Sequence, residues 1–254
     1  MEALATPPVK ENQLLNVFAF LFYPTGVYRI WKKENALWLR LLYTLLGLPL
    51  FLIIATFLAI IAFASFLPDL DMSIGDRKDR TVINREGNYA STFLKTGRET
   101  NGAYELIRVE VEPNGGNSWH YHKTFDEQFT VEQGELTVGL EGREIKLQAG
   151  QEAQAKKSQL HFFQNKTATK AVLIVKTTPA RGLEKSVRIV YGLGNDGQFK
   201  GEITENPWHM ALLLGYSETF LPDIPPIIQE PMVKSLAKIA QWKGEDKALE
   251  RYFR

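Results

Sequence analysis

The sequence predicts a mainly β domain that follows an apolar membrane helix and precedes a helical C-terminal segment. Three observations predict this order. Apolar and polar residues alternate over 107–112, 127–132 and 136–140, which is the pattern of half-buried strands. Residues 41–67 carry no charge, and after Pro231 apolar residues recur at helical spacing.

The alternating runs assign an inward face to each predicted strand. Residues 172–176 predict a last strand, buried on both faces and ended before Pro179. Glu127 lies on an apolar face, where an uncompensated carboxylate is costly. The inward residues are Ile107, Val109, Val111, Glu127, Phe129, Val131, Leu136, Val138 and Leu140.

Three of the four histidines share a pattern with this carboxylate that is typical of a metal site. His120 and His122 are two residues apart, so on a strand both imidazoles project from the same face. Imidazoles and a carboxylate are an ordinary ligand set for first-row divalent metals, and such a cation would offset the charge of the buried acid. The predicted metal ligands are His120, His122, Glu127 and His161.

The segments that carry these ligands resemble the two motifs of the cupin superfamily. The first reads His120-x-His122-x4-Glu127-x6-Gly134. The second reads Gly150-x5-Lys156-x-Ser158-x2-His161-x3-Asn165. The resemblance covers residues 80–180 and implies a single conserved antiparallel barrel of the double-stranded β-helix, or jelly-roll, type. It also implies one metal held by three histidines and one glutamate.

The sequence departs from these motifs in two loops. Lys156 and Ser158 stand where the family has proline and glycine, and the two glycines ahead of the first histidine are out of register. The departures concern turn geometry more than the ligands. Lys156 and Lys157 could hold an anionic substrate, although a solvated turn is the simpler interpretation. Barrels of this family can also keep the fold without a metal.

Other residues near the site have structural interpretations. Asp126 points away from the face of Glu127 and is interpreted as a rim residue, and Asn165 as a structural hydrogen-bond former. His209 is interpreted as a packing histidine of the C-terminal segment. Four aromatic side chains could line an apolar pocket or simply fill the core. These are Tyr104, Trp119, Phe129 and Phe163.

The resemblance leaves the chemistry open. Relatives with this ligand set include dioxygenases and other oxidoreductases, isomerases, decarboxylases and barrels that only bind a ligand. The divalent metal could be Fe, Mn, Ni, Cu or Zn, with positions left open for water, oxygen or a small-molecule substrate. The catalytic residues are unknown. Two hypotheses follow: a membrane-anchored metalloenzyme, dioxygenase-like or another oxidoreductase, and a non-catalytic ligand-binding or assembly module.

The uncharged stretch 41–67 predicts a transmembrane helix. Its 27 residues exceed the roughly 20 needed to cross a bilayer. Ala62-Phe63-Ala64 suggests a cleaved signal peptide instead, but the core of such a peptide spans only about 7–15 residues. A buried helix of a soluble protein is the third interpretation, although the stretch has no polar face. An uncleaved anchor fits best.

Residues 1–40 predict an interfacial or short membrane helix with a basic connection. The apolar piece 14–28 is interrupted at Pro24, and it could be a second span, a re-entrant segment or an interfacial helix. Residues 68–76 carry acidic side chains and no basic ones, so the positive-inside rule makes the basic connection cytoplasmic. The barrel is then extracytoplasmic in a single-pass or two-pass protein. The basic residues are Arg29, Lys32, Lys33 and Arg40.

Residues 181–254 predict a helical extension. Asn206 and Pro207 have the pattern of a helix cap and a first-turn proline, and a second helix is expected from Pro231 to Gly244. The apolar, proline-rich residues 221–228 predict a loop that packs on the barrel, on another subunit, as in a homodimer, or on the bilayer.

Composition excludes some kinds of partner and of chemistry. The chain has no cysteine, so disulfides and thiolate chemistry are excluded. The net charge is +1 and no long basic run is present, which argues against nucleic acid. The expected partners are the membrane lipid bilayer and a small-molecule substrate.

Overall fold

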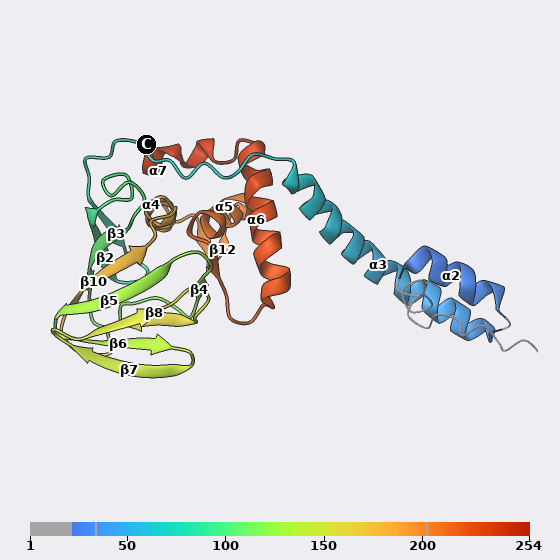
Figure 1. The fold of residues 1–254 in the computed structure, drawn as a ribbon, viewed down its shortest axis with the longest axis horizontal. Helices are drawn as coiled ribbons and strands as arrows, with labels where there is room; N and C mark the ends of the chain where they lie inside the picture. Colours follow the sequence, from blue (N-terminus) through green and yellow to red (C-terminus); the bar gives the residue numbers. More distant parts are fainter. Residues whose placement is uncertain (1–21, 34, 202) are drawn as a thin grey trace, which may run out of the picture. The chain divides into compact units, whose positions relative to one another are not determined.

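The computed structural model describes residues 22–33, 35–201 and 203–254 (Figure 1). The chain divides into two compact units, 1–62 and 63–254. The first unit contains α2 (Tyr23–Lys32) and most of α3 (Leu37–Ser65). Pro24 lies in the first turn of α2, where a helix needs no N–H group, so a helix begins there, and Phe22 before it has an extended backbone. Residues 14–21 of the predicted piece lie outside the described residues.

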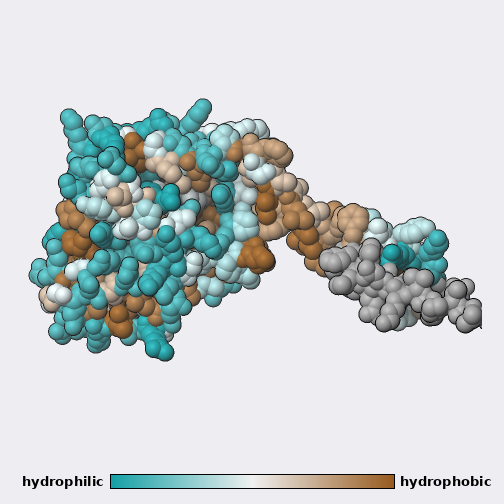
Figure 2. Space-filling model, viewed as in Figure 1, coloured by the Kyte–Doolittle hydropathy of each residue, from teal (hydrophilic) through white to brown (hydrophobic). Residues whose placement is uncertain are grey.

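The helix α3 is the one described helix that is long and apolar enough to cross a membrane. It begins four residues before the predicted stretch and ends two residues before Leu67, since Pro68 disfavours helical backbone in the residue before it. Its leucines and isoleucines are largely exposed, and Figure 2 shows hydrophobic side chains along it. Tyr23 of α2 donates a hydrogen bond to the Thr44 carbonyl at 2.8 Å, which holds the two helices together.

The second unit contains a barrel of two antiparallel sheets. The larger sheet has the order β1-β2-β3-β10-β5-β8 and the smaller has the order β7-β6-β9. The predicted last strand, β10, lies between β3 and β5, at the centre of the larger sheet. The strands are β1 (Thr81–Asn84), β2 (Tyr89–Lys95), β3 (Glu105–Val111), β5 (Asp126–Gln133), β6 (Glu135–Leu140), β7 (Arg143–Gln148), β8 (Glu152–Ala155), β9 (His161–Gln164) and β10 (Ala171–Thr178).

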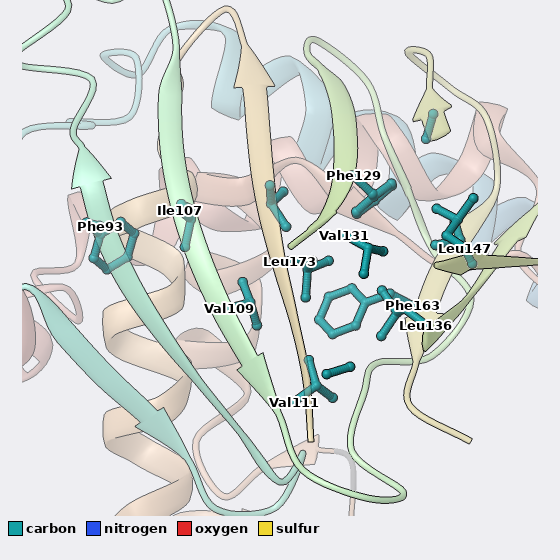
Figure 3. Packing of buried hydrophobic residues seen from close by; sticks show 14 residues of the cluster. Phe93, Ile107, Val109, Val111, Phe129, Val131, Leu136, Leu147, Phe163 and Leu173 are labelled. Carbon is teal, nitrogen blue, oxygen red and sulfur yellow. The ribbon is translucent and has the colours of Figure 1, made fainter. Parts of the chain in front are cut away.

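The predicted inward faces meet in the core of the barrel. Burial alternates residue by residue along β3, as its sequence predicts. Figure 3 shows Val131, Leu173 and Phe163 turned toward one another between the strands. Each large apolar side chain buried in this way contributes about 1.5–3 kcal/mol. The core thus fixes the direction of Glu127, which lies two residues before the buried Phe129 on the same face of β5.

A helical segment follows the barrel and forms a second apolar cluster. Asn206 caps α5 as predicted, with its side chain accepting a hydrogen bond from the Trp208 N–H at 3.0 Å. The start predicted for the second helix is wrong, because α6 begins at Pro226 and Pro231 lies inside it. Pro226 suits a first turn, and Pro231 removes only one backbone hydrogen bond. The helices are α4 (Leu183–Asn195), α5 (Pro207–Ser217), α6 (Pro226–Trp242) and α7 (Glu250–Phe253).

The apolar segment 221–228 is exposed. Its last three residues belong to α6 and not to a loop, and Ile227 is 83% exposed. The prediction that these side chains pack on the barrel is therefore wrong. Packing on a second subunit or on the bilayer remains a prediction.

Candidate metal centre

The structure brings the four predicted ligands together. His120 and His161 form an isolated antiparallel bridge, with hydrogen bonds of 3.0 and 2.8 Å between their backbones. His122 lies in β4 (Tyr121–His122), and Glu127 points inward from β5. One ligand atom from each of the four lies within 4.8 Å of the other three. All but His120, which is partly buried, are buried.

Each histidine is oriented through Nδ1, which donates a hydrogen bond to a backbone carbonyl. The acceptors are the carbonyls of Ser118, Ser217 and Gln159, at 2.7, 3.1 and 2.8 Å from His120, His122 and His161 respectively. Because a carbonyl can only accept, Nδ1 carries a proton, and in the neutral imidazole Nε2 keeps its lone pair. Metal-binding histidines are generally fixed in this way.

The chemistry of the cluster suits a divalent cation. Oε2 of Glu127 lies 3.1 Å from Nε2 of His161, and Oε1 lies 3.9 Å from Nε2 of His122. Nε2 of His161 is buried and has no well-aligned hydrogen-bond partner among the described residues. A buried imidazole nitrogen that has no well-aligned partner and lies beside a buried carboxylate is an arrangement that a metal ion completes.

Burial governs the protonation of the cluster. Burial, with the neighbouring histidines, lowers the pKa of His120 to about 3, and burial lowers the pKa of His122 to about 4. Burial opposes ionisation of Glu127, but His161 and the other histidines hold its pKa at about 2. Burial also disfavours the charged form of His161, but Glu127 outweighs this and raises its pKa. A metal would therefore compete with one proton, at His161.

The turn of the second motif has a left-handed residue at Ser158, where the family has glycine. Ser158 has a φ of +64°, the left-handed conformation that glycine adopts most easily, and its N–H donates to the His122 carbonyl at 2.7 Å. The Asp126 carboxylate accepts from the Lys157 N–H at 2.9 Å, in agreement with its predicted place at the rim. Lys156 and Lys157 are exposed.

The other assigned structural residues behave as predicted. Asn165 is fully buried, and its amide donates to the carbonyls of Val111 and Thr169 at 2.9 and 2.7 Å. Gly116 allows a close approach, because a Cβ there would lie 2.3 Å from the Phe163 carbonyl oxygen. His209 of α5 lies outside the cluster.

A cavity of about 290 Å³ opens onto the cluster. Phe129 and Phe163 line it, whereas Tyr104 and Trp119 do not. Trp119 packs edge-on against Phe162, and Tyr104 lies below the ammonium group of Lys176. The interpretation of Tyr104 and Trp119 as pocket residues is therefore wrong.

The helical segment supplies half of the cavity wall, which the sequence interpretation missed. Lining residues in α4 recur at helical spacing, a signal of one apolar face that was available in the sequence. The end of α5 and the strand β13 (Thr219–Phe220) close the site, because Thr219 pairs with His122. The lining residues of the two helices are Leu183, Ser186, Val187, Val190, Tyr191, Met210, Leu213, Leu214 and Ser217.

Fold and site together define a small antiparallel barrel with a three-histidine, one-glutamate cluster in its mouth. Residues 107–176 match the family model described as the cupin domain. The chain therefore carries a domain of the cupin superfamily, as the motifs predicted. No curated protein sequence matches the chain.

Several solved structures resemble part of the chain. KdgF from Halomonas sp. is 18% identical, with 42% of this chain and 93% of that chain covered and a TM-score of 0.36. A predicted oxalate decarboxylase from Thermotoga maritima is 17% identical, with coverages of 36% and 80% and a TM-score of 0.35. The polyketide cyclase RemF from Streptomyces resistomycificus is 21% identical, with coverages of 42% and 82% and a TM-score of 0.36. At these values the neighbours say nothing of what this chain does.

Proposed function

We propose that the protein is a membrane-anchored metalloenzyme that acts on a small molecule as an oxidoreductase of the dioxygenase-like kind. The observation that carries the proposal is the buried cluster of three Nε2 atoms and one carboxylate beside a cavity. The holding residues would be His120, His122, Glu127 and His161. A redox-active divalent metal bound there would supply the electron transfer that oxygen chemistry requires.

The side chains of the cavity favour metal chemistry over acid–base chemistry by the protein. Glu127 is the only carboxylate among the lining residues, and it already belongs to the metal cluster. The two lining tyrosines, Tyr89 and Tyr191, have pKa values raised by burial, so their phenols stay protonated near neutral pH. The protein's part would be to hold the metal, exclude water and orient the substrate.

Metal content tests the site directly. The full chain would be purified in detergent, loaded in turn with iron, manganese, nickel, copper and zinc, and measured by elemental analysis. We expect near-stoichiometric metal in the wild type and loss in His120→Ala. His209→Ala is the matched control, since it removes a histidine outside the cluster, and it should keep the metal. Equal metal in all three proteins would refute the assignment of ligands.

An open coordination position separates the enzyme from the alternative, a non-catalytic ligand-binding or assembly module. Nitric oxide is a probe of such a position in the iron-loaded protein, and we expect its electron paramagnetic resonance signal only where the cluster is intact. Iron that binds without this signal, or a protein that takes up no metal, would favour the module.

Membrane anchoring by α3 is the second part of the proposal. Its length, its apolar composition and its exposed side chains support it. Because the chain lacks cysteine, single cysteines can report topology without background. In intact cells an impermeant maleimide should label Glu144→Cys in the barrel, and Lys33→Cys only after lysis. The reverse pattern would overturn the proposed orientation, and recovery of the protein without membranes would overturn the anchor.

A further inference from the structure

The polar groups of the cavity fall into two separate sets. The metal cluster is one set. The other consists of the hydroxyls of Tyr89, Ser91 and Tyr191, which interact with one another. The remaining lining hydroxyls are committed to the protein: those of Ser186 and Ser217 both donate to the Leu213 carbonyl at 3.0 Å, and that of Thr219 donates to the Ser217 hydroxyl at 2.7 Å. The hydroxyl set is thus left to meet a bound molecule, together with the amide nitrogen of Asn117, whose Oδ1 accepts from the Phe163 N–H at 2.8 Å.

Each set has a member on the larger sheet. Ser91 points inward from β2, and Glu127 points inward from β5, with β3 and β10 between them. The two sets are thus three strands apart on the curved sheet, and across the cavity the Glu127 charge adds to the effect of burial in raising the pKa of both tyrosines. Tyr191 reaches the cavity from α4, and its ring packs edge-on against that of Tyr89, with 5.6 Å between the ring centroids.

The surface between the two sets is apolar. Ile107, Val109 and Val175 line it from the sheet, and Val187, Val190 and Leu213 line it from the helices. Among the described residues that line this cavity, there is no lysine, arginine or aspartate. A second charged group on a bound molecule would therefore be buried without a partner, which costs several kcal/mol.

From this arrangement we infer the substrate class of the site: a small molecule with one metal-binding group, an apolar body, and an uncharged hydroxyl or carbonyl group that Tyr191 and Ser91 bind at the far end. Tyr191 is thus a specificity-determining residue that lies outside the matched cupin domain. The inference rests on the proposed metal site.

Three matched probes test this class on the zinc-loaded full chain: 2-naphthoate, 6-hydroxy-2-naphthoate and 2,6-naphthalenedicarboxylate. All carry one carboxylate for the metal and differ only at the far end. We expect the hydroxyl to strengthen binding about five-fold, the value of one hydrogen bond, and the second carboxylate to weaken it at least ten-fold. Isothermal titration calorimetry gives the three dissociation constants.

Tyr191→Phe should remove the five-fold preference for the hydroxyl, so that the dissociation constants of 6-hydroxy-2-naphthoate and 2-naphthoate become about equal within the variant. Tyr104→Phe, at a tyrosine outside the cavity, is the control and should behave as the wild type. A dicarboxylate that binds as well as 2-naphthoate, or a hydroxyl preference that survives in Tyr191→Phe, would overturn the inference. A chain that binds no zinc would instead overturn the proposed function, and the two failures are thereby distinguished.

Discussion

Nδ1 of His122 donates a hydrogen bond to the carbonyl oxygen of Ser217, which lies 95 residues later in the chain. Ser217 is the last residue of α5, where helix carbonyls lack intrahelical partners and the helix dipole is negative. The end of a helix thus orients one predicted metal ligand. Because α5 lies outside the matched domain, the site depends on the C-terminal extension as well as on the barrel.

Thr219→Val should weaken metal binding about 10-fold, the lower end of the usual effect of a residue that supports a ligand. The Thr219 hydroxyl lies 3.3 Å from Nδ1 of His122 and donates to the Ser217 hydroxyl at 2.7 Å, so its loss leaves the histidine less firmly held. Competition with a chelator measures the affinity. Thr92→Val, at an exposed threonine pair, is the control, and equal affinities in the two variants would contradict the role of Thr219.

Ser158→Gly should stabilise the protein by about 1 kcal/mol, since the left-handed conformation costs a residue with a side chain roughly 1–2 kcal/mol. The hydrogen bond from its N–H to the His122 carbonyl is kept. Urea unfolding of the metal-free chain gives the difference. Lys157→Gly, one position earlier, should bring no gain, and a stabilisation of the same size there would point to a general loop effect instead.

Glu105→Gln should make the protein more stable at alkaline pH. Burial, together with the nearby Glu184 carboxylate, raises the pKa of Glu105 to about 8 from an ordinary value of 4.5. Between these two values the folded state holds a proton that the unfolded state has lost, so stability falls as the pH rises through this window. The substitution removes that loss, and we expect a gain of about 5 kcal/mol at pH 9 and little change at pH 4.

Urea midpoints at pH 4, 7 and 9 measure this effect. Glu110→Gln, on the exposed face of the same strand, is the matched control, because Arg108 lowers the pKa of Glu110. That variant should not gain stability as the pH rises. A flat pH dependence in the wild type would contradict the predicted shift of Glu105.

Arg188→Met should destabilise the second unit by about 3–5 kcal/mol, because it leaves a buried charge without its partner. Arg188 and Glu184 form a buried ion pair at 2.9 Å on α4, one turn apart. Adding Glu184→Leu should recover most of the loss. Thermal unfolding of both single variants and of the double variant completes a double-mutant cycle. Losses of stability that simply add would show that the two residues are not coupled.

Three of the four clustered residues could be predicted from a local pattern, and His161 from the resemblance of the second motif. Two histidines on one face of a strand and a carboxylate on an apolar face are visible within eight residues, and the strand periodicity fixes their direction. The pairing of Thr219 with His122 could not be predicted, since contacts between distant segments leave no periodic signal. The direction of the Trp119 side chain could not be predicted, because Trp119 precedes the isolated bridge at His120 and lies in no regular strand. The start of α6 could not be located from Pro231, because a helix tolerates the loss of one backbone hydrogen bond near its beginning.

The pairing of β4 with β13 has a consequence for the order of assembly during synthesis. His120, Glu127 and His161 can meet as soon as the barrel strands have formed, whereas His122 has its carbonyl partner only after the chain has been made as far as Ser217. At about 5–20 residues per second, the interval between His161 and that residue is a few seconds. A barrel that folds within this interval would hold His122 only loosely, and a metal bound there could exchange before the site closes around it.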